Sequence, residues 1–127
     1  MALNLPANEI HIWRLQLDQQ YAGLREGSNL LSSEERARAS RYHFECDRRR
    51  FLVCRVLLRV ILGRYLDLEP SQVRFGYGSH GKPFLAKELD DTGLCFNISD
   101  SHELALFSFA HRLHLGIDLE YIREIPD

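Results

Sequence analysis

Residues 45–70 read ECDRRRFLVCRVLLRVILGRYLDLEP, and this stretch predicts the central element of the fold. Its apolar side chains recur at spacings of three and four, the period of an α-helix with one apolar face, at Val53, Val56, Leu57, Val60 and Ile61. Three arginines fall on another face, at Arg48, Arg55 and Arg59. Because the residue before a proline disfavours helix, we expect a buried helix over about 46–65 that ends before Pro70.

The residues before this helix predict a second helix and a first strand. Ser32 or Ser33 precedes two glutamates, which is typical of an N-cap followed by an acidic first turn. We therefore expect a helix over about 33–43. Further upstream, EIHIWRLQL at 9–17 is rich in apolar residues around a tryptophan and predicts the first strand.

After residue 72 the apolar pattern changes to a period of two, which is typical of strands. VRFGYG at 73–78 predicts a short strand, and SHGKP at 79–83 predicts a turn. Three further strands are expected at 94–99, 103–110 and 113–122, the last two forming a hairpin. Helices gather early and strands late, which favours the α+β class.

Size and composition indicate one domain over residues 1–127. The chain is 45% apolar and 27% charged, as expected for a soluble globular protein, and no run approaches the ~18 apolar residues of a membrane span. No basic segment precedes an apolar one at the start, so we expect no signal peptide. Cys46, Cys54 and Cys95 are odd in number and widely spaced, which argues against disulfides or zinc and favours the cytoplasm.

The net charge of −2 hides an excess of arginine in the first half of the chain. There are 14 arginines and two lysines, and eight of the arginines fall between Arg36 and Arg59. Arginine presents a planar, permanently charged fork that suits phosphate. A nearly neutral protein with such a cluster is expected to bind a small anionic ligand rather than nucleic acid, which usually meets a broadly basic surface.

Asp118 and Glu120 project from the same face of the last predicted strand. Two hard carboxylates at this spacing can share Mg²⁺, which neutralises their mutual repulsion and leaves positions for water and phosphate oxygens. The alternative is a solvated edge strand with both acids in water, and on spacing alone this is favoured because D-x-E is common.

A second candidate site consists of arginines and one lysine that could cradle several phosphates: Arg36, Arg38, Arg48, Arg49, Arg50, Arg55 and Lys82. The alternative is a solvated helix face whose arginines pair with nearby acids, and it accounts for most of them. Arg55 fits it least because it lies within the apolar run FLVCRVLL, and Lys82 is an exception because it lies in a rigid turn between glycine and proline.

A third candidate is the polar run FNISDSH at the end of a predicted strand. Ser99, Asp100 and His102 could hold a phosphate or take a proton there. The alternative is a hairpin turn, which Asn, Asp and Ser favour in any case.

Four segments, taken in order, resemble the N-terminal half of an Sfp-type 4′-phosphopantetheinyl transferase. They are SSEERARASRYHFECDRRRFLVCRVLLR, GKPFL, FNISDS and GIDLE, and together they cover nearly the whole chain. The resemblance implies an antiparallel sheet packed against a long central helix. It also implies transfer of 4′-phosphopantetheine from coenzyme A to a serine of an acyl or peptidyl carrier protein, with Mg²⁺.

The resemblance assigns expected roles by position. Asp118 and Glu120 fall on the family's metal-binding, catalytic carboxylates. Lys82 falls on the lysine of the GKP motif that contacts a coenzyme A phosphate, and Ser99 on a serine that also meets the ligand. Arg38 falls on a basic position for the 3′-phosphate, and Arg50 and Arg55 match positions around the nucleotide.

The chain departs from the family pattern in two respects. Asp100 stands where the family usually has histidine, and His102 follows two residues later as a possible substitute in ligand binding. The family's other half carries a WxxKE motif, whereas Trp13 is the single tryptophan here. We therefore expect one half of a two-half transferase that binds coenzyme A weakly and cannot transfer alone.

Two alternatives stay open at the level of sequence. Two copies could pair as the two halves of the full enzyme do. The chain could instead be a non-catalytic module that binds coenzyme A or a carrier protein without chemistry.

Overall fold

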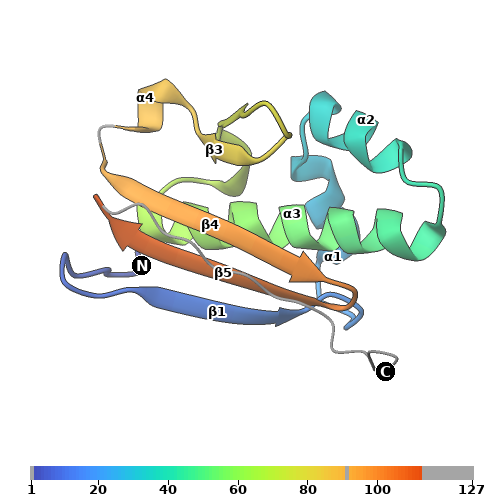
Figure 1. Cartoon of the computed structure of the whole chain (residues 1–127), viewed down its shortest axis with the longest axis horizontal. Helices are drawn as coiled ribbons and strands as arrows, with labels where there is room; N and C mark the ends of the chain where they lie inside the picture. Colours follow the sequence, from blue (N-terminus) through green and yellow to red (C-terminus); the bar gives the residue numbers. More distant parts are fainter. Residues whose placement is uncertain (1, 91, 113–127) are drawn as a thin grey trace, which may run out of the picture.

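The computed structural model describes residues 2–90 and 92–112, and it places the helix α3 (Glu45–Leu66) against one face of a three-stranded antiparallel sheet (Figure 1). The sheet has the order β1-β5-β4, formed by His11–Gln16, Leu104–His111 and Leu94–Ser101. The remaining elements are α1 (Leu24–Gly27), the 3₁₀ turn η1 (Ser28–Leu30), α2 (Ser33–Ser40), the 3₁₀ turn η2 (Pro70–Gln72), β2 (Phe75–Tyr77), β3 (Pro83–Leu85) and α4 (Lys87–Asp90).

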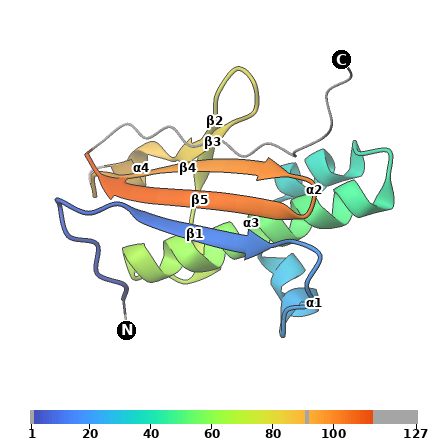
Figure 2. The same ribbon diagram turned by 60° about the horizontal axis from the view of Figure 1, so that its bottom comes forward.

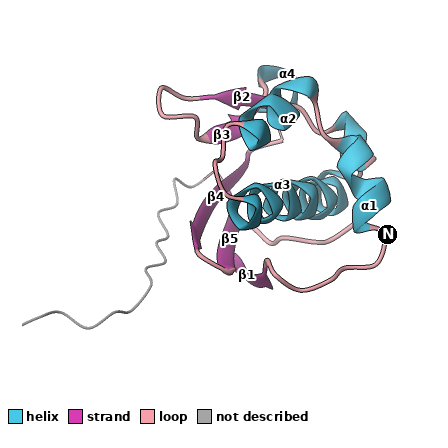
Figure 3. Cartoon of the chain, turned by 90° about the vertical axis from the view of Figure 1, so that its right-hand side faces the viewer, coloured by secondary structure: helices cyan, strands magenta, loops and turns pink. Residues whose placement is uncertain are grey.

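The helix α3 lies between two layers. Figure 3 shows it nearly end-on, with the sheet on one side and with α1, α2 and the β2–β3 hairpin around its other sides. The hairpin lies beyond the β4 edge of the sheet (Figure 2). The predicted α+β class, with an antiparallel sheet packed on a long central helix, is confirmed.

The helix boundaries follow local signals in the sequence. The helix predicted over 46–65 is observed as α3. The Oγ of Ser32 accepts a hydrogen bond from the amide of Glu35 at 3.1 Å, and the Glu35 carboxylate accepts one from the amide of Ser32 at 2.8 Å. This reciprocal capping fixes the start of α2. The helix ends at Ser40, earlier than the predicted residue 43, because Phe44 is already the extended cap of α3.

The core joins α3 to the sheet. Val53, Leu58 and Leu62 of α3 meet Phe107 and Phe109 of β5, and none of these side chains is more than 1% exposed. Burial of each contributes about 1.5–3 kcal/mol relative to exposure. This packing fixes β4, the neighbour of β5, relative to the N-terminal half of α3.

The polar run FNISDSH is mostly strand. β4 continues to Ser101, which pairs with Leu104, so the turn consists of His102 and Glu103 alone. His102 adopts the left-handed region at φ 54°. Asp100 is therefore a strand residue with a fixed direction. The strand predicted at 113–122, and its hairpin with β5, lie outside the described residues.

A buried ion pair ties α2 to α3. Glu35 is fully buried, and its carboxylate lies 2.7 Å from Nη2 of Arg59, which is 5% exposed. Arg59 also donates to the carbonyl of Pro70 at 3.2 Å. The arginine–glutamate pairing considered from the sequence thus occurs here in the interior, and it anchors the chain that leads into β2.

Candidate functional site

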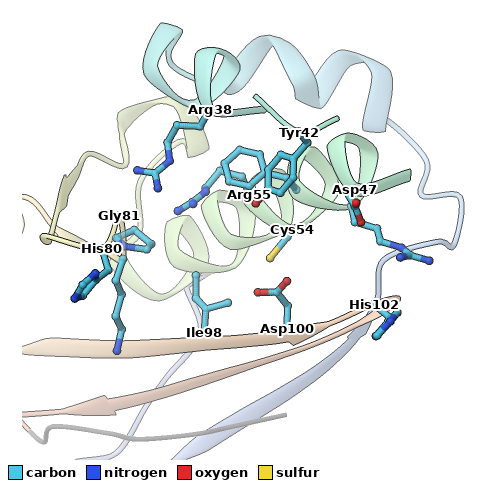
Figure 4. A pocket seen from close by; sticks show the side chains of 14 residues that line it. Arg38, Tyr42, Asp47, Cys54, Arg55, His80, Gly81, Ile98, Asp100 and His102 are labelled. Carbon is cyan, nitrogen blue, oxygen red and sulfur yellow. The ribbon is translucent and has the colours of Figure 1, made fainter. Parts of the chain in front are cut away.

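A pocket of about 380 Å³ opens where the N-terminal half of α3, the end of β4 and the β2–β3 hairpin meet (Figure 4). The sequence offered ten candidate ligand-binding side chains, and six of them line this pocket: Arg38, Arg50, Arg55, Lys82, Asp100 and His102. These six come from α2, α3, the β2–β3 hairpin, β4 and the β4–β5 turn. Arg36, Arg48, Arg49 and Ser99 do not line it.

Strand alternation determines which residues of β4 reach the pocket. Ile98 and Asp100 share one face of β4 and point toward α3 (Figure 4). Ser99 lies between them, so its side chain projects from the other face of the sheet, and it is absent from the pocket lining. A ligand contact by Ser99 stays a prediction, and it would have to be made on that other face.

Arg55 lines the pocket and carries a buried donor without a partner among the described residues. Its side chain is 9% exposed, its guanidinium stacks on the ring of Phe51 at 4.9 Å, and its Nε lies 3.7 Å from the carboxylate of Glu35. Nη1 is buried and has no hydrogen-bond partner in the described part of the chain. A buried donor without an acceptor costs about 1–3 kcal/mol, more for a charged group, and an anion in the pocket would remove that cost.

The β2–β3 hairpin holds Arg38 at the edge of the pocket. The Arg38 guanidinium stacks on the ring of Tyr77, with Cζ 5.1 Å from the centroid. Gly81 also lies close to this guanidinium: it has φ +79°, and a Cβ built there would lie 1.9 Å from Nη2 of Arg38. Glycine at this position therefore permits both the turn and the close approach of Arg38. Lys82 follows directly and is exposed at the pocket edge.

Arg50 lines the pocket, but its guanidinium already donates hydrogen bonds to another side chain. Nε and Nη2 donate to the two carboxylate oxygens of Asp18 at 2.9 and 3.0 Å. This hydrogen bonding lowers the pKa of Asp18 and raises the pKa of Arg50. Arg50 would bind a phosphate only by sharing its guanidinium with Asp18.

The β4 side of the pocket disfavours negative charge. Burial raises the pKa of the Cys54 thiol to about 12, with a further contribution from the charge of Asp100. Burial also raises the pKa of Tyr42. Asp100 keeps contact with solvent, yet the pocket walls around it raise its pKa, an effect that the nearby charge of Arg55 opposes. Cys54 is thus a protonated thiol at neutral pH rather than a nucleophile.

Sequence reasoning did not select several residues that line the pocket, among them Asp47, Phe51, Cys54 and His80. A signal for the helical ones was present. Positions 47, 51, 54 and 55 follow one another at helical spacing, so they share the face of α3 that carries Arg55. His80 had no such signal because the hairpin places it.

Asp118 and Glu120, the predicted metal ligands, lie outside the described residues. Within residues 2–90 and 92–112, no group of three His, Cys, Asp or Glu side chains is placed to hold a metal ion. In the same part of the chain, no helix combines the length and apolar character that crossing a bilayer requires.

A long helix on an antiparallel sheet, with three arginines and a lysine in the lining of one pocket, defines an α+β domain. Comparison with known proteins gives the family. The family model described as "4′-phosphopantetheinyl transferase, N-terminal" matches residues 18–111, and the chain belongs to the 4′-phosphopantetheinyl transferase family. This confirms the resemblance noted in the sequence.

Three relatives are similar over most of this chain. The 4′-phosphopantetheinyl transferase HetI of Nostoc sp. is 47% identical over 125 residues, which are 98% of this chain and 53% of HetI. The 4′-phosphopantetheinyl transferase Sfp of Bacillus subtilis is 32% identical over 97 residues, 76% of this chain and 42% of Sfp. A phosphopantetheinyl transferase of Thraustochytrium sp. is 29% identical over 120 residues, 90% of this chain and 40% of the relative. The chain thus spans about half the length of these relatives or less.

Proposed function

We propose that this chain forms the coenzyme A-binding wall of a 4′-phosphopantetheinyl transferase, which transfers 4′-phosphopantetheine from coenzyme A to a serine of an acyl or peptidyl carrier protein. The observation that carries this proposal is the buried, unpartnered Nη1 of Arg55 in a pocket that Arg38 and Lys82 also line. Three cations around one cavity match a ligand with several phosphates.

The proposed reaction exchanges one phosphorus–oxygen bond for another. The hydroxyl oxygen of the carrier serine attacks the phosphorus next to pantetheine, and the bond to the other phosphate breaks. 3′,5′-ADP leaves with the electron pair, and the serine proton passes to a base. The negative charge that develops on the leaving group is what Arg38, Arg55 and Lys82 would stabilise.

The pocket residues act by position and charge. Arg55 is held by Phe51 and Glu35, and Arg38 is held by Tyr77 and the hairpin, so both guanidiniums are ordered before a ligand arrives. Such preorganised cations avoid the reorganisation that water would need during charge transfer. With its high pKa, Cys54 offers no covalent route, which agrees with direct attack by the carrier serine.

Asp118 and Glu120 are the proposed Mg²⁺ ligands. When bound, Mg²⁺ would neutralise charge on the phosphate oxygens. We further propose that a second half of comparable size supplies the WxxKE lysine and glutamate, in keeping with the share of HetI and Sfp that this chain covers. The three separated cysteines favour action in the cytoplasm.

Titration of coenzyme A into the 127-residue chain, with and without Mg²⁺, tests the proposal. Arg38→Ala and Lys82→Ala each remove a charge-assisted contact worth ~1.5–3 kcal/mol, so we expect binding to weaken by about tenfold or more. Arg41→Ala is the matched control because Arg41 is exposed and does not line the pocket. Absence of coenzyme A binding, or equal affinity in all three variants, would contradict the proposal.

A non-catalytic binding module is the second candidate, and the carboxylate of Asp100 in the pocket favours it because this charge opposes a phosphate there. Mass spectrometry of a carrier protein incubated with coenzyme A and a chain that includes the second half separates the two. Transfer lost in Asp118→Ala supports the transferase. Coenzyme A binding that is independent of Mg²⁺ and without transfer supports the module. We expect no transfer by the 127 residues alone.

A further inference from the structure

Asp100 places an exposed carboxylate, a hydrogen-bond acceptor, in the lining of the pocket. It projects from β4 toward α3 and lines the same cavity as Arg55 (Figure 4). Within the described part of the chain, no cation lies within ion-pair distance of its carboxylate. Its surroundings disfavour the ionised form, so a neutral donor that approaches it would be stabilising.

The cations nearest to β4 do not neutralise Asp100. Arg50 is engaged by Asp18, and Arg55 shares the carboxylate of Glu35. Of the lysine and arginines that line the pocket, Arg38 and Lys82 have no ion pair among the described residues; Lys82 lies in the β2–β3 hairpin, and Arg38 stacks on Tyr77 of that hairpin. The pocket is therefore polarised, with positive charge toward the hairpin and a carboxylate toward β4.

A ligand that satisfies both sides needs an anionic acceptor and, next to it, a neutral hydrogen-bond donor. The buried Nη1 of Arg55 has no acceptor among the described residues, and the exposed carboxylate of Asp100 can accept a hydrogen bond from a donor on the ligand. A nucleotide combines them, because its phosphate oxygens accept and its ribose hydroxyls donate. Acidic side chains select free ribose hydroxyls in dinucleotide sites in the same way, whereas an arginine there accommodates a phosphate on the ribose.

On the basis of the proposed function, we propose that Asp100 determines specificity by accepting a hydrogen bond from a ribose hydroxyl and disfavouring a ribose phosphate. The pocket then discriminates donors by their 3′ substituent. It favours dephospho-coenzyme A, which has a free 3′-hydroxyl, relative to coenzyme A, which has a 3′-phosphate. Repulsion between a carboxylate and a phosphate a few ångströms apart corresponds to about tenfold in affinity even where solvent screens it.

The experiment measures the affinities of both nucleotides for the 127-residue chain at pH 8, by calorimetry and by amide NMR. In the unmodified chain, dephospho-coenzyme A binds at least as tightly as coenzyme A. Asp100→Asn keeps an acceptor oxygen and removes the charge, so coenzyme A binds about tenfold more tightly and dephospho-coenzyme A changes little. Asp67→Asn is the control. Asp67 caps the far end of α3, so this substitution removes the same charge at a position outside the pocket.

The outcomes separate this inference from the proposed function. If Asp100→Asn changes the affinities for coenzyme A and dephospho-coenzyme A by the same factor, or changes neither affinity, the selectivity assigned to Asp100 is overturned. The assignment is also overturned if coenzyme A binds more tightly than dephospho-coenzyme A to both the unmodified chain and Asp100→Asn. That result would mean that the 3′-phosphate meets a favourable group, the role that the family resemblance implies for Arg38. If neither nucleotide binds the folded chain, the proposed function itself fails. Amide spectra verify the fold, and Asp100→Ser replaces Asp100→Asn if the latter is misfolded.

Discussion

Gly81→Ala tests whether the hairpin positions Arg38 for its ligand. Gly81 has φ +79°, where a residue with a Cβ costs ~1–2 kcal/mol. The new Cβ would lie 1.9 Å from Nη2 of Arg38 and 2.9 Å from its Cζ, so the guanidinium must move. Because it is the far end of a flexible side chain, it can swing away from the stack on Tyr77, and the fold survives.

Two separate magnitudes follow from this geometry. The free energy of unfolding falls by ~1–2 kcal/mol from the backbone strain. Coenzyme A binding loses the contact with Arg38, which is worth ~1.5–3 kcal/mol for a charged hydrogen bond, so affinity falls by about ten- to a hundredfold. Urea denaturation measures the first quantity and calorimetric titration the second.

Gly78→Ala is the matched control in the same hairpin. A Cβ there meets nothing closer than the carbonyl of Lys82 at 3.8 Å, which is an ordinary contact, so affinity should stay within about twofold. A double variant isolates the mechanism. If Arg38 carries the effect, Gly81→Ala costs little further affinity once Arg38 is alanine, since interacting positions are not additive. If Gly81→Ala lowers the affinity for coenzyme A equally with Arg38 present and with Arg38 replaced by alanine, Arg38 does not carry the effect.

Three further outcomes are expected. Glu35→Gln leaves Arg59 buried without a counter-charge and lowers the free energy of unfolding by ~3–5 kcal/mol, whereas Glu45→Gln in an exposed pair costs less than ~1 kcal/mol; equal costs in urea denaturation would contradict this. Burial raises the pKa of Asp100, so its stabilising contribution is present at low pH and is lost as the pH rises through the folded-state pKa; Asp100→Asn should therefore be the more stable chain at neutral pH, with a difference that shrinks on acidification. Tyr77→Leu removes the ring under Arg38 and should weaken coenzyme A binding about two- to fivefold, with no such loss in Tyr77→Phe.

Local patterns in the sequence predicted most of the secondary structure. The spacing of apolar residues in α3 and the serine–glutamate cap of α2 are properties of neighbouring residues, so the sequence alone reveals them. The end of α2 and the extent of β4 were predicted less well. Both depend on residues further along the chain, because an extended Phe44 ends the helix and pairing with β5 continues the strand to Ser101.

The candidate site was predictable in its residues more than in its shape. Arg55 stood out from the sequence because a charge within an apolar run needs a reason, and the structure shows it stacked on Phe51 in a pocket. The separation of Ser99 from Asp100 was not predicted, since it depends on whether the run is strand or turn. The sequence also could not show that Asp18, which is distant along the chain, already accepts two hydrogen bonds from the guanidinium of Arg50.

Distant pairing also explains how so many arginines coexist in one small domain. Glu35 neutralises Arg59 in the interior, Asp18 neutralises Arg50, and each pair fixes an element rather than a ligand. Among the arginines that line the pocket, Arg38 stacks on Tyr77, and Arg55 stacks on Phe51 while its Nε lies 3.7 Å from the carboxylate of Glu35. A ring orders a guanidinium without quenching its charge, whereas a carboxylate does both. A carboxylate partner therefore ties Arg59 and Arg50 to the fold, although Arg50 also lines the pocket, whereas Arg38 lines it with a ring and no ion pair among the described residues.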